Sequence, residues 1–471
     1  MARSADKTEL FERTPVTKAI MILAVPTIIS SLVTMVYSLV DTLFVGMINE
    51  AVQSAAVTLA YPMLISLNAI NNLFGVGASS MMSRALGAYD RETAKRSSAF
   101  GFYCSIFFGI LYSCAFWCFT SFFLNLLGAE ADTSEATRQY LTWTIGFGAT
   151  PGILNVVMAY MVRSEGASLH ASIGTMSGCI LNIILDPIFI LPWGLDMGAA
   201  GAGCATFVSN CVACVYFFIL MFVKRKTTVV CFNPKKFTFK KEIVKGVFGV
   251  GIPASIQNIL NVTSMTVLNN FAANYGSAAV AAMGISQRIS HVPMYINFGM
   301  SQGIQPLIGY NYSNGNVKRL KQAFNYAHRI SLFLMLVISV CCWIFAGNLI
   351  KIFMTDAEVV EHGTKLLKAF SFFAFFFVTD QLGIGVYQAC GLGGYALTFA
   401  VVRKAVLEIP LLIIMDAVYP LYGLPYAQVI TEIILTVAAG IVLFRLFRKF
   451  DREGTPIKTK PKKKRGSPKT Q

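Results

Sequence analysis

The most constraining feature of this sequence is a series of apolar stretches, each long enough to cross a bilayer as a helix. A spanning helix needs roughly 20 apolar residues. Twelve such stretches follow one another, at 18–47, 53–82, 98–127, 139–162, 169–192, 197–223, 246–273, 279–310, 324–354, 364–390, 395–418 and 423–447. Because 55% of the 471 residues are apolar and only 13% are charged, little chain remains for a soluble domain. We therefore expect an all-α polytopic membrane protein.

A basic segment divides these stretches into six and six. Residues 224–245 form the longest polar interruption, and we interpret them as a linker. The first apolar stretch is too long for a signal-peptide core and has no small-residue cleavage site, so we expect it to be retained. The expected organisation has five parts: an N-terminal segment (1–15), an N-lobe (16–223), the linker (224–245), a C-lobe (246–449) and a basic tail (450–471).

The distribution of Lys and Arg supports this layout. Cytoplasmic loops of membrane proteins carry an excess of positive charge. If both termini are cytoplasmic, 34 of the 39 Lys and Arg residues fall on the cytoplasmic side, with Arg403 and Lys404 counted in a loop. The bias predicts an even number of spans in the inner (plasma) membrane. The net charge of +16 and the tail KPKKKRGSPKTQ then indicate contact with anionic lipid rather than nucleic acid.

The two halves resemble each other at an offset of roughly 225 residues, the kind of internal repeat that membrane transporters show. Pro26 and Phe44 are spaced like Pro253 and Phe271, and further matches are Gly166 with Gly391, Gly198 with Gly423, and Thr206 with Thr431. Each six-span unit would start and end on the same side. We therefore predict a parallel repeat with a pseudo-two-fold axis along the membrane normal, and two bundles that face a central cleft.

Two acidic residues fall inside spans of the N-lobe. A charged side chain at mid-span costs at least about 2.5 kcal/mol, so it indicates function by default. Asp41 and Asp186 should lie at a similar depth, with Tyr37 one turn from Asp41 and Asn182 one turn from Asp186. Thr206 reaches a similar level. Such a group can bind Na⁺ or share a proton, and the alternative is a hydrogen-bonded structural cluster.

Two further N-lobe residues are candidates. Pro26 removes a backbone hydrogen bond in mid-span and permits a kink. It would act as a hinge if the kink changes with the charge of the neighbouring carboxylates, and a static kink is the alternative. Asn155 could line the N-lobe cavity or bind a neighbouring helix.

The C-lobe holds its own intramembrane charges. Asp380, Glu408 and Glu432 lie in its last three spans, and Arg288 is the one Arg we count inside a span rather than at a span end. We expect Arg288 to be available to pair with one of the acids, which would make that pair structural. The run FSFFAFFFV (370–378) fits either an aromatic wall for flat substrates or lipid-facing bulk.

No motif for soluble catalysis is present. The sequence contains no GxxxxGK[ST], HExxH or GxSxG. We therefore expect a protein that is not an enzyme, needs no cofactor and is not driven by ATP.

The chain resembles the multidrug and toxic compound extrusion (MATE) transporters over nearly its whole length. The resemblance rests on VPTIISSLVTMVYSLVDTLFVG, MVRSEGASLHA, LNIILDPIFI, GAAGAGCAT, GIPASIQN and QPLIGYNYSNGNVKRLKQA. It implies two six-helix lobes in a V, and export by alternating access coupled to inward movement of H⁺ or Na⁺.

The resemblance also implies site residues. In the branch with an N-lobe cation site, the motif positions fall on Asp41, Asn182, Asp186 and Thr206, and a tyrosine and an asparagine of span 4 fall on Tyr140 and Asn155. The branch with a C-lobe acidic site has a Glu in span 7, where this chain has Asn261, and Asp380 lies about one residue from its span 10 acid. This departure favours coupling through the N-lobe.

We therefore expect a monomeric antiporter that exports amphipathic, cationic drugs or toxic metabolites in exchange for H⁺ or Na⁺. A flippase for lipid-linked intermediates is the alternative. Such a protein should line its cleft with several basic side chains that bind phosphate, and Arg288 alone does not meet that requirement.

Overall fold

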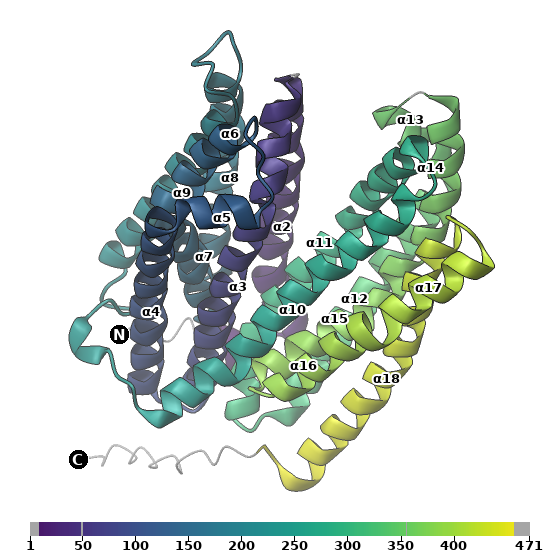
Figure 1. Ribbon diagram of the computed structural model, residues 1–471. Helices are drawn as coiled ribbons and strands as arrows, with labels where there is room; N and C mark the ends of the chain where they lie inside the picture. Colours follow the sequence, from purple (N-terminus) through teal and green to yellow (C-terminus); the bar gives the residue numbers. More distant parts are fainter. Residues whose placement is uncertain (1–8, 49, 355, 456–471) are drawn as a thin grey trace, which may run out of the picture.

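The structure is a computed structural model that describes residues 9–48, 50–354 and 356–455. This part of the chain is helical and contains no strand. Part of the expected N-terminal segment (1–8) and most of the expected basic tail (456–471) lie outside the described residues. Figure 1 shows two helical bundles in a V, which converge on the side where the described part of the chain begins and ends. We call this side the termini side and the opposite side the open side.

The N-lobe spans are built from six long helical segments. Its fourth span is bent by 50° between a first part, α6 (Ser134–Leu141) with the π-helical turn η1 (Thr142–Phe147), and a second part, α7. The remaining elements are α2 (Val16–Met47), α3 (Ala51–Gly87), α4 (Arg91–Cys118), the short α5 (Thr120–Leu126), α7 (Ala149–Ser164), α8 (Ser168–Ile190) and α9 (Gly198–Val223).

The C-lobe repeats this arrangement after a linker that contains a short 3-10 turn, η2 (Pro234–Lys236). Its fourth span is also bent, by 42° between α14 (Ala357–Phe370) and α15 (Phe373–Ala389). The other elements are α10 (Lys241–Ala273), α11 (Ser277–Ser313), α12 (Val317–Ile344), the short α13 (Ala346–Phe353), α16 (Gly393–Val401), the π-helical turn η3 (Val402–Glu408), α17 (Ile409–Val418) and α18 (Gly423–Glu453).

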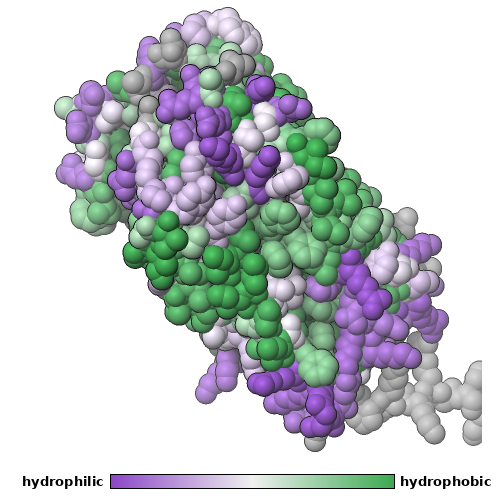
Figure 2. Space-filling model, turned by 90° about the vertical axis from the view of Figure 1, so that its right-hand side faces the viewer, coloured by the Kyte–Doolittle hydropathy of each residue, from purple (hydrophilic) through white to green (hydrophobic). Residues whose placement is uncertain are grey.

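The expected twelve-span membrane fold is confirmed. In the described part of the chain eight helices are long and apolar enough to cross a membrane, and each bent pair adds one span. The two remaining spans, α11 and the continuous segment α16–η3–α17, are more polar. Figure 2 shows a belt of hydrophobic side chains between two ends where hydrophilic ones gather. The belt is the surface expected to face lipid.

The predicted repeat is visible in how the lobes meet. The first helix of each lobe packs on the second helix of the other, so α2 contacts α11 and α10 contacts α3. Gly166 and Gly391, paired in the sequence analysis, both adopt left-handed backbone angles, with φ of 86° and 77°, just after the fourth span of their lobe. This conformation favours glycine because it has no Cβ.

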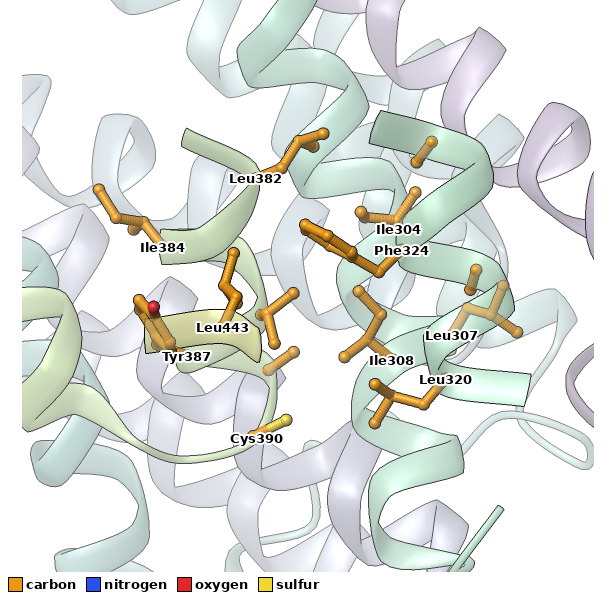
Figure 3. Close-up of a cluster of buried hydrophobic side chains, with 14 of the residues drawn as sticks. Ile304, Leu307, Ile308, Leu320, Phe324, Leu382, Ile384, Tyr387, Cys390 and Leu443 are labelled. Carbon is orange, nitrogen blue, oxygen red and sulfur yellow. The ribbon is translucent and has the colours of Figure 1, made fainter. Parts of the chain in front are cut away.

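A large hydrophobic core holds the C-lobe together on the termini side. Figure 3 shows side chains from α11, α12, α15 and α18 that point toward one another, among them Ile308, Phe324, Leu382 and Leu443. The same cluster includes Leu23 and Ala24 from α2 of the N-lobe. The core therefore also joins the two lobes where they converge.

Candidate functional site

A cavity of about 570 Å³ lies between the two lobes. This volume is within the range of pockets that bind drug-sized molecules. Its polar lining is mostly amides and hydroxyls, including Ser30, Thr34, Asn68, Asn71 and Asn72 from the N-lobe and Asn258, Asn261, Gln287, Gln302 and Gln428 from the C-lobe. An apolar part of the wall is formed by Met265, Met294, Phe298, Phe370, Phe373 and Phe377. Three phenylalanines of the run 370–378 thus contribute to an aromatic wall.

The structure brings the predicted N-lobe residues together. Asp186 on α8 is fully buried, and the Asn182 amide, with its nitrogen toward Asp186, donates to Asp186 Oδ2 at 2.8 Å. In this orientation the Asn182 oxygen accepts from the backbone nitrogen of Thr206 on α9 at 3.0 Å. Asp41 on α2 is half-buried, and its Oδ1 is buried without a hydrogen-bond partner. Asp41 lies near enough to Asp186 for the two carboxyl groups to influence each other.

Two tyrosines complete this group. Tyr37 lies near Asp41 and the Thr206 side chain, and Tyr140 lies near both carboxylates. In the described ranges no Lys, Arg or His forms an ion pair with either acid. The two carboxylates and the Thr206 hydroxyl are oxygen ligands of the kind that a hard cation prefers, so the residues present fit Na⁺ as well as a proton.

Asn155 and Pro26 lie elsewhere in the N-lobe. Asn155 on α7 is buried, and its Nδ2 donates to Asn210 Oδ1 on α9 at 3.2 Å. Its partner is therefore a neighbouring helix, which was one of the two alternatives. Pro26 lies inside the single long helix α2. It sits between Ala24 and Ile28, whose backbones contact α11 at Gly303 and Gly299.

The C-lobe acids form a charge cluster with two bases that the sequence analysis assigned to a loop. Arg403 lies in η3 and is 4% exposed. It donates to Glu432 Oε1 at 2.5 Å, and its Nη1 is 3.3 Å from Asp380 Oδ2. The following Lys404 is 2.6 Å from Glu408 Oε2. The cluster brings three acids and two bases into the membrane region.

The expectation that Arg288 pairs with one of these acids is wrong. Arg288 is exposed on α11 and forms no ion pair with any described residue. Helix α11 presents Gln287, Ser290 and His291 to the cavity instead. Asn261 does line the cavity, but it stands apart from the ion pairs that hold Asp380, Glu408 and Glu432.

Sequence reasoning missed three cavity residues, Arg163, Arg403 and Lys404. Charge counting placed all three in cytoplasmic loops, although Arg403 and Lys404 fall inside the apolar stretch 395–418 and only Arg163 lies at the end of one. Arg163 stands inside the quoted motif MVRSEGASLHA, and that motif is the one signal that could have singled it out.

The same two-part organisation appears in the comparison with known families. The MatE family matches the chain twice, over residues 26–188 and again over residues 253–414. The chain belongs to the MatE family. The two matched segments begin at Pro26 and Pro253, the repeat-related prolines of α2 and α10. One matched segment therefore falls within each of the two lobes that enclose the cavity.

Curated relatives cover almost the whole of this MatE chain. It is 33% identical over 437 residues to the multidrug export protein MepA of Staphylococcus aureus strain MSSA476, which spans 93% of this chain and 95% of the relative. It is 32% identical to MepA of Staphylococcus saprophyticus with the same coverage.

Solved structures of MatE relatives agree with the fold. One, described as the outward-facing conformation of a multidrug resistance MATE transporter, superposes with a TM-score of 0.88 at 26% identity. A second is a transporter from Pyrococcus furiosus, for which a reversed polarity of the binding pocket is said to suggest a different function. Its TM-score is 0.87 at 25% identity. Each match covers 94% of this chain and 98% of the other.

Proposed function

We propose that this chain is a secondary active antiporter that exports amphipathic organic compounds in exchange for H⁺ or Na⁺. The observation that carries the proposal is a pair of acids in the N-lobe, Asp41 and Asp186, without a basic partner among the described residues. Two close carboxylates in a poorly hydrated site gain stability when they bind a proton or a small cation. Such a group is suited to coupling, and the names of the curated relatives support multidrug export.

The acid pair and the cavity are separate, so coupling acts through helices. Asp41 and Asp186 do not line the cavity, but their helices do, through Ser30 and Thr34 of α2 and Thr175 of α8. A change in the charge of the acid pair alters how α2 packs against α8 and α9. Because Ser30 and Thr34 move with α2, cation binding changes the cavity wall. Pro26 supplies a point at which α2 can bend without losing a normal backbone hydrogen bond.

The transport cycle follows from this arrangement. A cation enters from the open side, neutralises the acid pair and favours a shape of α2 that releases the substrate. After the lobes rock, the cation leaves on the termini side and the cavity receives a new substrate. Both lobes of the cavity come from one chain, so we expect the monomer to be the functional unit. We also propose that the protein lies in the plasma membrane with both termini in the cytoplasm.

Everted membrane vesicles test this proposal. Vesicles that contain the chain should accumulate ethidium, or another of a panel of fluorescent amphiphiles, when either a pH gradient or a sodium gradient is imposed, and the effective gradient identifies the ion. Asp41→Asn and Asp186→Asn should reduce gradient-driven uptake to the level of empty vesicles. Asp132→Asn makes the same change at an exposed position and should have no effect. Wild-type uptake by an Asp41→Asn variant that is normally expressed would refute the mechanism.

The flippase remains a second candidate because of one observation. Arg163, Arg403 and Lys404 all line the cavity, whereas the sequence analysis found too few basic residues for a phosphate-bearing substrate. Arg403 and Lys404 are already paired with acids, which weakens this reading. Transfer of a fluorescent lipid pyrophosphate between leaflets of proteoliposomes, without an ion gradient, would favour the flippase over the antiporter.

A further inference from the structure

The charged lining of the cavity has one sign. Arg163, Arg403 and Lys404 face it, while no Asp or Glu does among the residues that the structure describes. A cavity built to bind a permanent cation would be expected to present a carboxylate to it. The lining therefore argues that a substrate group other than a cation contacts the polar part of the wall.

Two of these bases already have acidic partners. Arg403 bridges Glu432 and Asp380, and Lys404 pairs with Glu408. Glu408 also accepts hydrogen bonds from Ser264 at 2.5 Å and from Gln428 at 2.9 Å. Arg403 and Lys404 are thus already neutralised by acids of the C-lobe, and little of their charge is left to attract a ligand anion.

Arg163 has no acidic partner. It is 6% exposed, and in the part of the chain that is described it forms no ion pair. Its Nη1 donates to Gln302 Oε1 at 2.8 Å, its guanidinium lies 5.5 Å from the ring centre of Tyr160, and its Nε has no hydrogen-bond partner. The neighbouring acid, Glu165, uses its Oε2 to accept from Thr228 and Val229, both at 2.9 Å.

An unpaired buried cation is costly, and the cost is relieved when an anion binds. A guanidinium matches a carboxylate because its N–H groups form two parallel hydrogen bonds to the two oxygens. Phe370, Phe373 and Phe377 border the same cavity and suit the apolar body of an organic molecule. Gln302 belongs to α11 of the C-lobe, so the polar contact around Arg163 includes both lobes.

We propose that Arg163 binds the carboxylate of an amphipathic organic substrate and that Gln302 orients its guanidinium. This inference rests on the proposed export function and gives the substrate class: compounds that carry a carboxylate, zwitterions included. It adds to the sequence-based expectation of amphipathic, cationic compounds, because a zwitterion also offers an anionic group to Arg163.

Two dyes with one fluorophore test the proposal. Rhodamine 110 carries a free carboxylate, and rhodamine 123 is its methyl ester. Fluorescence polarisation with the purified full-length chain in detergent measures both affinities. The wild type should bind the acid at least about tenfold more tightly than the ester, as expected for a charge-assisted hydrogen bond. In Arg163→Gln this ratio should fall to near one. The exposed Arg138→Gln should keep the wild-type ratio.

A second variant covers the case in which Arg163→Gln does not fold. Gln302→Glu keeps the side-chain length and places a carboxylate beside Arg163. This internal counter-ion should occupy the guanidinium and also reduce the ratio to near one. Equal affinities of the wild type for acid and ester, or a wild-type ratio in both variants, would overturn the proposal.

Further results distinguish the source of the anion. Binding of chloride or inorganic pyrophosphate could depend on Arg163 while binding of rhodamine 110 does not. In that case the site serves a free anion or a pyrophosphate, and the carboxylate proposal is wrong. A different result would contradict the proposed export function: wild-type vesicles that move neither ethidium nor rhodamine 110 under either gradient. The affinity ratio measured in detergent does not depend on that result.

Discussion

Ser80 of the N-lobe donates its hydroxyl to the backbone oxygen of Gln388 in the C-lobe at 2.5 Å. Close by, the Arg84 guanidinium donates to the carbonyl of Gly246 at 3.5 Å, again between lobes. They join the C-terminal ends of α3 and α15 and the start of α10, on the side where the two bundles of Figure 1 converge. They close the cavity toward the termini side, so an alternating-access cycle must break them.

A disulfide at this closure should stop transport. A Cβ atom placed on Gly309 of α11 would lie 3.3 Å from the Cβ of Ser83 on α3, slightly closer than the spacing in disulfides. Ser83→Cys combined with Gly309→Cys should therefore cross-link the lobes on oxidation. Gradient-driven dye uptake should disappear and return after addition of a reductant. Each single variant is the control, and continued transport by a fully cross-linked protein would show that this closure does not open.

Residues 9–14 of the N-terminal segment also contact both lobes. Phe11 is buried and stacks on Tyr310 of α11, with ring centres 4.8 Å apart, and it also touches Gly166 of the N-lobe. Glu12 accepts hydrogen bonds from Tyr310 and from Tyr89 of the N-lobe. Arg319 binds the Phe11 carbonyl at 2.6 Å. These contacts therefore join the two lobes on the termini side.

Phe11→Ala should weaken these contacts between the lobes and favour the conformation that opens on the termini side. Removal of a buried Phe costs about 3–5 kcal/mol, and the part of this cost that belongs to contacts between lobes shifts the conformational equilibrium. Hydrogen–deuterium exchange should increase in the segments of α3 and α11 on the termini side. Phe239→Ala removes a 71% exposed ring and serves as control. Unchanged exchange in Phe11→Ala would mean that the segment does not stabilise closure.

A third prediction concerns the contact between α2 and α11. A Cβ atom on Gly303 would lie 2.5 Å from Cα of Ala24, two residues before Pro26. Gly303→Leu should therefore force α2 away from α11 and reduce transport strongly, because overpacking at a helix contact costs about 1–3 kcal/mol. Gly394→Leu adds the same side chain where there is open space and should transport normally. Wild-type dye uptake by Gly303→Leu would show that transport does not need the close contact between α2 and α11.

The periodic features of the sequence were sufficient to predict the architecture. The length of the apolar stretches follows from the bilayer thickness, and the repeated positions of Pro and Gly follow from backbone conformation. The proximity of Asp41 and Asp186 was also predictable, because the positions of two residues along their spans determine their depth in the membrane. Their role in coupling stays a prediction.

The partners of the charged residues could not be predicted in the same way. Arg163 lies at a span end and Arg403 was counted in a loop, and the sequence does not say whether such a side chain points to water or into a cavity. That choice depends on the rotation of each helix against its neighbours. It also depends on local irregularities such as the π-helical turn that carries Arg403 and Lys404. For the same reason Arg288, the more obvious intramembrane cation, was assigned a partner that it does not have.

The last prediction distinguishes Arg403 from Arg288 by their contributions to the free energy of unfolding. Arg403 is the counter-ion of two carboxylates that are both 1% exposed, Asp380 and Glu432, and its guanidinium lies 4.6 Å from the centre of the Phe377 ring. Arg403→Gln leaves both acids without a cation, which should lower the free energy of unfolding by about 3–5 kcal/mol. The loss should be larger at alkaline than at acidic pH, because protonated acids no longer need a counter-ion. Thermal unfolding in detergent at several pH values measures this effect. Arg288→Gln, an exposed change, should stay within about 0.5 kcal/mol of the wild type, and equal stabilities of the two variants would contradict the assignment of Arg403 as the counter-ion.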